Sequence, residues 1–183
     1  MGRAVVGGGV LVLCLCALGY GVGEATGTGA RMSAAAAQNP ASAFHVDTCD
    51  ASLWNHVYHG IFPTAKDRLK VFDPCIAVTG TIEVARPEAD GDRHILLRVD
   101  PQFSKLLNAK NMTAEKGFLV IEPVCELKVT QPDTIKEGVC KSFHQNLYAA
   151  KLHGKHVSVI GAYIEDQEHG WRELHPVTSI TPN

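Results

Sequence analysis

Residues 154–180 read GKHVSVIGAYIEDQEHGWRELHPVTSI, and the pattern of this stretch decides the fold class. Its first run, residues 155–165, is rich in β-branched and aromatic residues, and its second run, residues 171–180, alternates with the two-residue period of a strand. The sequence DQEHG between the runs supplies turn formers and the glycine that a hairpin loop needs. We therefore expect these residues to form an antiparallel hairpin.

The polar side chains of this hairpin are concentrated near its turn. Residues two apart on a strand share a face, so Glu173 and His175 are expected on the same side as Trp171. Asp166 and His169 lie in the turn itself. We expect this hairpin to be the functional edge of the domain. The full alternation predicts one face with Arg172, Leu174, Pro176 and Thr178 and the other with Trp171, Glu173, His175 and Val177.

An earlier segment has the same design. Apolar and polar residues alternate within residues 69–84 and again within residues 93–99, with the polar turn RPEADGD between the two runs. Gly80 falls inside the first run, where a glycine marks a bulge or a sharp bend. The two runs are expected to pair as a hairpin that carries Asp90, Asp92 and His94.

Three further elements complete the expected domain. Apolar residues at helical spacing predict a helix with Asp50 or Asp47 as its N-cap that runs toward Ile61. The sequence GFLVIEPVCE, residues 117–126, predicts a third strand in which Pro123 confines one point to an edge or a bulge. Residues 141–151 are expected to form a helix.

The resulting order is helix, three strands, helix and two strands. This order resembles that of the OB-fold, a five-stranded partly open barrel with a helix between its third and fourth strands. The predicted fold class is mainly β: a small five-stranded OB-like partly open barrel with an N-terminal helix and one or two short helices. The motifs WNHVYH, DGDRH, EPVC and HGWRELHP are also similar to those of a family of small exported prokaryotic proteins without an established activity. The OB-fold resemblance implies binding of oligonucleotides or oligosaccharides, or phosphodiester hydrolysis of the staphylococcal-nuclease type.

The N-terminal segment has the pattern of a targeting signal. Arg3 precedes an apolar run at residues 4–18 that is too short to cross a bilayer comfortably, and small residues follow it. We expect residues 1–25 to be a signal peptide, with an uncleaved membrane anchor as the alternative. Residues 26–43 are dominated by small residues, which predicts a flexible tether before a folded domain at residues 44–183. The protein is therefore expected to be secreted, periplasmic or attached to the cell surface.

Four cysteines follow the targeting signal, and an even number implies two disulfides in an exported chain. Three connectivities are formally allowed. We expect Cys49 to pair with Cys75 and Cys125 with Cys140, because each pair closes a short local loop. A structural zinc site is the competing interpretation, and the lack of a CxxC pair counts against it.

Composition ranks the partner classes. The chain has 183 residues, of which 45% are apolar, which is enough for one domain with a core. The formal charge of −2 disfavours nucleic acid, because neutralisation of phosphates needs an excess of lysine and arginine. The expected partner is a small ligand, an oligosaccharide or a protein, and a membrane is expected only through an uncleaved N-terminal segment.

Imidazole and carboxylate side chains of the two hairpins form the candidate site. If the two turns lie close together, these groups converge in a composition that suits a divalent transition metal such as zinc. A structural hydrogen-bond network is the alternative, as is a surface ion pair of Glu173 with Arg98 or Arg172. His56 and His59 share a predicted helix face and are secondary metal candidates. The ligand or metal candidates are Asp92, His94, Asp166, His169, Glu173 and His175.

No catalytic motif accompanies these residues. The sequence contains no GxSxG elbow, no HExxH helix and no P-loop, so no catalytic residue is assigned. We expect a non-enzymatic extracytoplasmic binding module that presents the edge at residues 169–175, with Asp92 and His94, to a ligand or partner. The alternative is a metal-dependent hydrolase of phosphodiester or similar bonds, with ligands or acid–base groups from His94, His169, Glu173 and His175.

Overall fold

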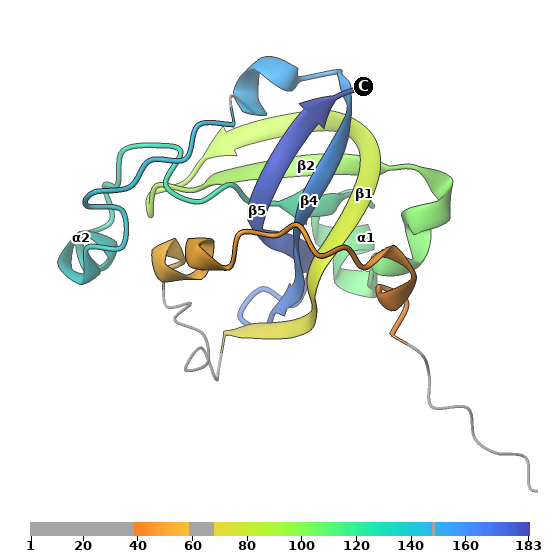
Figure 1. The fold of residues 1–183 in the computed structure, drawn as a ribbon, viewed down its shortest axis with the longest axis horizontal. Coiled ribbons are helices and arrows are strands. Elements are labelled where there is room, and N and C mark those ends of the chain that lie inside the picture. The colour runs from red at the N-terminus through yellow and green to blue at the C-terminus, as the bar shows by residue number, and fades with distance from the viewer. Residues whose placement is uncertain (1–38, 59–67, 148) are drawn as a thin grey trace, which may run out of the picture. The chain divides into compact units, whose positions relative to one another are not determined.

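A computed structural model describes residues 39–58, 68–147 and 149–183, and this part of the chain is mainly β. Five strands are joined in a ring of hydrogen bonds in the order β1-β2-β3-β5-β4, and β4 pairs back onto β1 (Figure 1). Neighbouring strands are antiparallel except for β3 and β5, which are parallel. The strands are β1 (Leu69–Pro87), β2 (Arg93–Val99), β3 (Leu119–Ile121), β4 (His156–Asp166) and β5 (Arg172–Pro182).

Short helices lie in the connections and before the first strand. The α-helices are α1 (Ala109–Ala114) and α2 (Pro132–Glu137). The 3-10 helices are η1 (Ser42–Phe44), η2 (Ala51–His56), η3 (Pro101–Leu106) and η4 (Ala149–Leu152). Within the described ranges, none of these helices has the length and apolar character needed to cross a membrane.

The inside of the ring is filled by apolar side chains from all five strands. Ile82, Leu97, Leu119, Val159 and Leu174 come from β1 to β5 in turn, and each is fully buried in one cluster. Burying a side chain of this size stabilises a fold by about 1.5–3 kcal/mol. The alternation that predicts the strands therefore also provides the core.

The expected bend in β1 is present, and Gly80 explains it. This strand curves along its length and pairs with β2 on one side and β4 on the other (Figure 1). A Cβ atom on Gly80 would lie 2.4 Å from the carbonyl oxygen of Arg98 and 2.8 Å from Cα of Val99. Only glycine permits this approach of the β2 backbone. A register shift follows between Ile82 and Val84.

Both predicted hairpins are confirmed, because β1 pairs with β2 and β4 pairs with β5. The predicted alternation of β5 is wrong beyond its first half, since Leu174 and Val177 both belong to the inner cluster. The register gives the reason. Gly161 is opposite Val177 and Tyr163 is opposite Leu174, so β5 contains one more residue than β4 in this interval. The bulge turns Val177 back toward the core.

The helix predicted over residues 141–151 is wrong. Residues 141–147 form turns and irregular chain, Tyr148 lies outside the described residues, and only η4 is helical. Gln145 accounts for this, because its side chain accepts a hydrogen bond from the Val124 amide at 2.9 Å and donates one to the Val177 carbonyl at 2.8 Å. These tertiary bonds hold the segment against the chain after β3 and the middle of β5.

Two other elements are shorter than expected. Asp50 caps η2 as predicted, accepting a hydrogen bond from the Ser52 amide, but η2 is a 3-10 helix that ends at His56. The remainder of the expected helix falls largely on residues 59–67, outside the described residues. The expected strand at residues 117–126 contracts to three residues, β3, and its pairing with β2 ends at Ile121, ahead of the proline.

The described chain begins before the predicted start of the domain. The Asn39 side chain donates a hydrogen bond to the Phe72 carbonyl at 2.6 Å, and Ala41 is fully buried in the core cluster. The end of the expected tether, which spans residues 26–43, therefore packs against the folded domain. The expected signal peptide at residues 1–25 and the rest of the tether lie outside the described residues.

The four cysteines form two pairs at disulfide distance, with the expected connectivity. The S–S distance is 2.09 Å for Cys49–Cys75 and 2.03 Å for Cys125–Cys140. The first pair ties the segment before β1 to that strand, and the second closes the loop that carries α2. Two such pairs fit an oxidising extracellular setting.

Candidate functional site

Glu122, the residue after β3, lies between two histidines of neighbouring strands. Ile95 is opposite Ile121 in the antiparallel pair of β2 and β3, and Ile121 is opposite Leu174 in the parallel pair of β3 and β5. One step further, His94, Glu122 and His175 fall in one row across three strands. We call them the His94–Glu122–His175 row. Oε1 of Glu122 lies 2.8 Å from Nδ1 of His94, and Oε2 lies 3.0 Å from Nδ1 of His175.

His94 is held by groups that make opposite demands on its second nitrogen. The guanidinium of Arg86 lies 2.9 Å from Nε2, and Oε2 of Glu115 lies 3.3 Å from the same atom. A guanidinium can only donate, whereas a carboxylate accepts, so the two contacts favour different protonation states of His94. Burial opposes the charged form, but the hydrogen bond to Glu122 and the nearby Glu88 outweigh it and raise the pKa of His94.

His175 is surrounded by three carboxylates. Besides Glu122, its Nδ1 lies 3.2 Å from Oε1 of Glu173, and its Nε2 lies 3.4 Å from Oδ2 of Asp92. Glu173 is held in turn by the indole of Trp171, which donates to its Oε2 at 2.8 Å. Since Nδ1 carries at most one proton, it can donate fully to only one of the two glutamates.

Two atoms of this site are buried without a hydrogen-bond partner. They are Nε2 of His175 and Oδ2 of Asp92, which face each other at 3.4 Å. Both residues are at most 2% exposed, and the other oxygen of Asp92 accepts a hydrogen bond from the Cys125 amide at 2.7 Å. At 3.4 Å the two atoms form an ion pair that is longer than an ordinary charge-assisted hydrogen bond, so their contact only partly compensates for their burial.

Burial and hydrogen bonding shift the ionisation of the site in opposite directions. Burial alone would raise the pKa of Glu122, but hydrogen bonds from His175 and His94 outweigh it and hold that pKa well below its usual value. Burial also opposes protonation of His175, yet the carboxylates around it raise its pKa well above the usual value. Burial raises the pKa of Asp92 to about 6 and also raises the pKa of Glu173. The carboxylates Asp92, Glu122 and Glu173 thus surround His175, and Glu122 is shared with His94.

Three groups of side chains in the described residues offer ligand atoms that all lie within 4.8 Å of one another. In one group Asp92 accompanies Cys125 and Cys140, whose sulfurs are joined in a disulfide and supply no thiolate. The other two share Glu122. One is Glu88, His94 and Glu122, in which both ring nitrogens of His94 have partners, and the other is Asp92, Glu122 and His175, which contains both unpaired atoms.

Four of the predicted site residues converge here, and two do not. Asp92, His94, Glu173 and His175 belong to the buried cluster. Asp166 instead pairs with Arg68 at 3.0 Å and accepts hydrogen bonds from amides of its own turn. His169 is half-exposed, bonds to Asp166 and stacks on Trp171 with ring centroids 4.4 Å apart. The turn therefore covers the edge of the cluster without joining it.

The secondary metal candidates are not brought to this cluster. Nδ1 of His56 lies 2.7 Å from the Val139 carbonyl, and its ring stacks on Phe143 with centroids 3.8 Å apart. These contacts give His56 a packing role. His59 lies outside the described residues.

The expected surface ion pairs of Glu173 are also wrong. Arg98 pairs with Glu83 at 2.6 Å, and Arg172 pairs with Glu165 at 3.5 Å. Glu173 is 1% exposed and turns inward to the row. A buried network therefore replaces the surface pairs.

Sequence reasoning missed Glu122, the centre of the site. Its signal is a single carboxylate inside the apolar run LVIEPVC, because an acidic residue is rarely buried without partners. Missed with it are the residues on the far side of His94, namely Arg86, Glu88 and Glu115.

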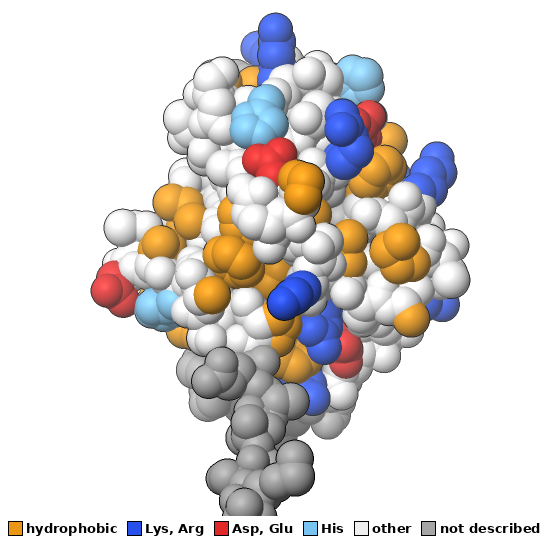
Figure 2. All heavy atoms as spheres, turned by 90° about the vertical axis from the view of Figure 1, so that its right-hand side faces the viewer, with side chains coloured by type: hydrophobic (Ala, Val, Ile, Leu, Met, Phe, Trp, Pro, Cys, Tyr) orange, Lys and Arg blue, Asp and Glu red, His pale blue; other side chains and the backbone are white. Residues whose placement is uncertain are grey.

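Charges of both signs are mixed on the face of the molecule in Figure 2. Lysine and arginine side chains lie among aspartate and glutamate side chains, with hydrophobic side chains between them. This face differs from the continuous basic stripe that tracks a nucleic-acid backbone.

Comparison with known proteins identifies no relative of this chain, since no family model, no curated protein and no solved structure matches it.

Proposed function

We propose that this protein is an extracytoplasmic, OB-like binding module that holds one divalent transition metal ion between Asp92, Glu122 and His175. The module is non-enzymatic, and the ion is its ligand. The motifs of the chain resemble those of a family of small exported prokaryotic proteins, and this resemblance assigns no activity.

The observation that carries the proposal is that Oδ2 of Asp92 and Nε2 of His175 are buried, have no hydrogen bond, and meet each other only as an ion pair at 3.4 Å. Two ligands about 2.0–2.2 Å from one tetrahedral ion are separated by roughly this distance. A cation between the two atoms would satisfy both at once. It would also offset the negative charge that three carboxylates place around one imidazole.

The donor set selects the class of ion. One imidazole and two carboxylates suit zinc, manganese, iron or cobalt, whereas calcium and magnesium prefer all-oxygen shells. Glu173 supports the histidine, because its carboxylate lies 3.2 Å from Nδ1 while Nε2 faces Asp92. A carboxylate that accepts from the second ring nitrogen fixes the orientation of a ligating histidine.

Burial favours binding over hydrolysis. The side chains of Asp92, Glu122 and His175 are each 6% exposed or less, so a phosphodiester has no direct access to an ion held by them. A polar pocket of about 380 Å³ lies beside the site, lined in part by Glu88, Asp90 and His169. Since Glu88 also lies 3.5 Å from His94, this pocket borders the His94 end of the row.

The strand order supports the fold in this proposal. A ring in the order β1-β2-β3-β5-β4, with a helix between β3 and β4, is compatible with an OB-like barrel. Export through the N-terminal segment is consistent with the two cysteine pairs at disulfide distance.

The experiment measures metal in protein purified without a chelator or an affinity tag. Element analysis is expected to give about one transition metal ion per chain, and protein stripped with EDTA should take up one equivalent of Co²⁺ with new visible absorption bands. Asp92→Asn and His175→Ala should each lose the ion while circular dichroism shows folded β structure. The matched control is His156→Ala, because His156 pairs with Asp100 at 3.0 Å on the surface, where no ion is expected.

Each contrary result has a definite meaning. Less than about a tenth of an ion per chain, together with no Co²⁺ bands in the stripped wild-type protein, would overturn the metal site and leave a proton-linked network. Retention of the ion in both site variants would place it elsewhere. If the loaded protein cleaves bis(p-nitrophenyl) phosphate and Asp92→Asn does not, the hydrolase replaces the binding module.

A further inference from the structure

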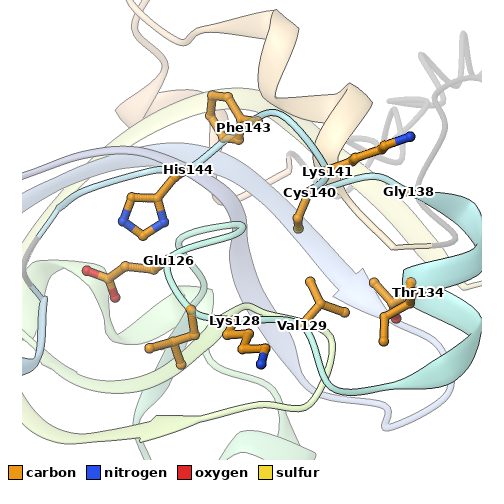
Figure 3. A pocket seen from close by; sticks show the side chains of 11 residues that line it. Glu126, Lys128, Val129, Thr134, Gly138, Cys140, Lys141, Phe143 and His144 are labelled. Carbon is orange, nitrogen blue, oxygen red and sulfur yellow. The ribbon is translucent and has the colours of Figure 1, made fainter.

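A pocket of about 750 Å³ lies on the loop between β3 and β4 (Figure 3), and its lining includes none of Asp92, Glu122 and His175. Its volume lies within the range of pockets that bind small molecules, about 300–1,000 Å³. Apolar and polar side chains both line it. The lining residues are Glu126, Leu127, Lys128, Val129, Thr134, Ile135, Gly138, Cys140, Lys141, Phe143 and His144.

The disulfide Cys125–Cys140 fixes this pocket. Most of the lining lies in the loop between the two cysteines, which also carries α2. Closing a loop of about 15 residues lowers the entropy of the unfolded chain and stabilises the closed form. Phe143, stacked on His56, forms the opposite wall. The pocket therefore lies on a loop that a disulfide closes.

The apolar wall includes a side chain that is left in water. Ile135 of α2 is 59% exposed, and among the described residues it is one of two exposed large hydrophobic side chains. The other is Met112, which lies on α1 and does not line the pocket. An apolar ligand body lying against Ile135, Val129 and Phe143 would remove this surface from water, which is favourable.

The charges at the pocket margin are positive. Within the described ranges, neither Lys128 nor Lys141 makes an ion pair, and both side chains are exposed. The carboxylate of Glu126 is already occupied, because one oxygen pairs with Arg93 and the other accepts from the Ala149 amide at 3.1 Å. The pocket therefore presents two free ammonium groups and no free carboxylate to a ligand.

We propose that this pocket binds an amphiphilic monoanion, a medium-chain carboxylate whose alkyl chain lies between Phe143, Val129 and Ile135 and whose head group pairs with Lys128 and Lys141. The charge complementarity selects an anion, and the apolar lining selects a flexible hydrocarbon chain. The pocket shares no lining residue with the proposed metal site, although the sulfur of Cys140 lies within 4.8 Å of a carboxylate oxygen of Asp92. Binding of the carboxylate does not depend on an ion at the metal site.

Isothermal titration of the disulfide-intact protein with dodecanoate tests the proposal, and dodecan-1-ol is the uncharged control ligand. Dodecanoate should bind with one-to-one stoichiometry and more tightly than the alcohol. The double variant Lys128→Glu/Lys141→Glu should weaken dodecanoate about tenfold or more while leaving the alcohol nearly unchanged. The matched control is Lys105→Glu/Lys110→Glu, which changes two lysines outside the pocket lining by the same charge.

A second pair of variants tests the apolar wall. Ile135→Glu should weaken binding of dodecanoate about tenfold or more, and Met112→Glu, at the same 59% exposure, should not change it. Both changed residues are exposed, so both variants are expected to fold. No binding of dodecanoate at millimolar concentration would overturn the proposal. Equal losses in pocket and control variants would also overturn it, because they would indicate adsorption to the general surface.

Discussion

Replacing Glu122 by glutamine tests whether the His94–Glu122–His175 row stabilises the fold even without an ion. Glutamine has the same shape, but it carries no charge and its single carbonyl oxygen cannot accept from both histidines. The wild-type carboxylate makes both contacts, at 2.8 Å and 3.0 Å, while the residue is only 4% exposed. Removing one partner of a buried ionic network costs about 3–5 kcal/mol.

The assay is urea unfolding in EDTA at pH 7 with the disulfides intact, so that bound metal does not contribute. Glu122→Gln should lose about 3–5 kcal/mol of unfolding free energy, or roughly 10–20 °C in melting temperature for a domain of this size. The matched control is Glu83→Gln. Glu83 pairs with Arg98 at 2.6 Å, but the arginine side chain is 61% exposed, so that variant should lose no more than about 1 kcal/mol.

The reasoning is refuted if the two variants lose similar amounts. It is also refuted if Glu122→Gln is more stable than wild type. That result would mean that repulsion among Glu122, Glu173 and Asp92 outweighs the pairing of Glu122 with the histidines.

Two further predictions concern the turn and the bend. Burial alone would raise the pKa of Asp166, but the charge of Arg68 outweighs burial and lowers that pKa. The charged form of Asp166 therefore stabilises the fold above the pKa of an unfolded aspartate, and this stabilisation is lost as pH falls. Asp166→Asn should therefore lower the free energy of unfolding by about 1.5–3 kcal/mol at pH 7. In urea unfolding, the difference in this free energy between the variant and wild type should narrow below about pH 4. A difference that does not change with pH would contradict this prediction. Gly80→Ala should cost about 1–3 kcal/mol, because its Cβ meets the backbone of Arg98 and Val99. A Cβ on Gly138 would meet only Cβ of Lys141, at 4.0 Å, so Gly138→Ala has only the cost of a positive φ and should lose less. The reverse ranking in thermal unfolding would contradict the steric argument.

The parts of the fold that could be predicted are those that follow from the local periodicity of apolar residues and from the spacing of the cysteines. The two-residue alternation gives both hairpins, and the short intervals between cysteines give their pairing. The helix over residues 141–151 could not be predicted correctly, because local propensity favours it and distant bonds from the Gln145 side chain to Val124 and Val177 override that propensity. The bulge that brings both Leu174 and Val177 into the core is likewise a property of the β4–β5 register.

The centre of the site depends on the parallel pairing of β3 with β5, which no sequence pattern predicts. The sequence predicts that the two hairpins lie together, and His94 and His175 do converge. The signal between them, Glu122 inside the apolar run LVIEPVC, was missed. β3 contains only three residues, yet it lies between β2 and β5 in the ring. The residue that follows such a strand is therefore flanked on both sides, by His94 through antiparallel pairing and by His175 through parallel pairing. A carboxylate is stable at that buried position because it can accept from both neighbours, which explains why Glu122 interrupts an apolar run.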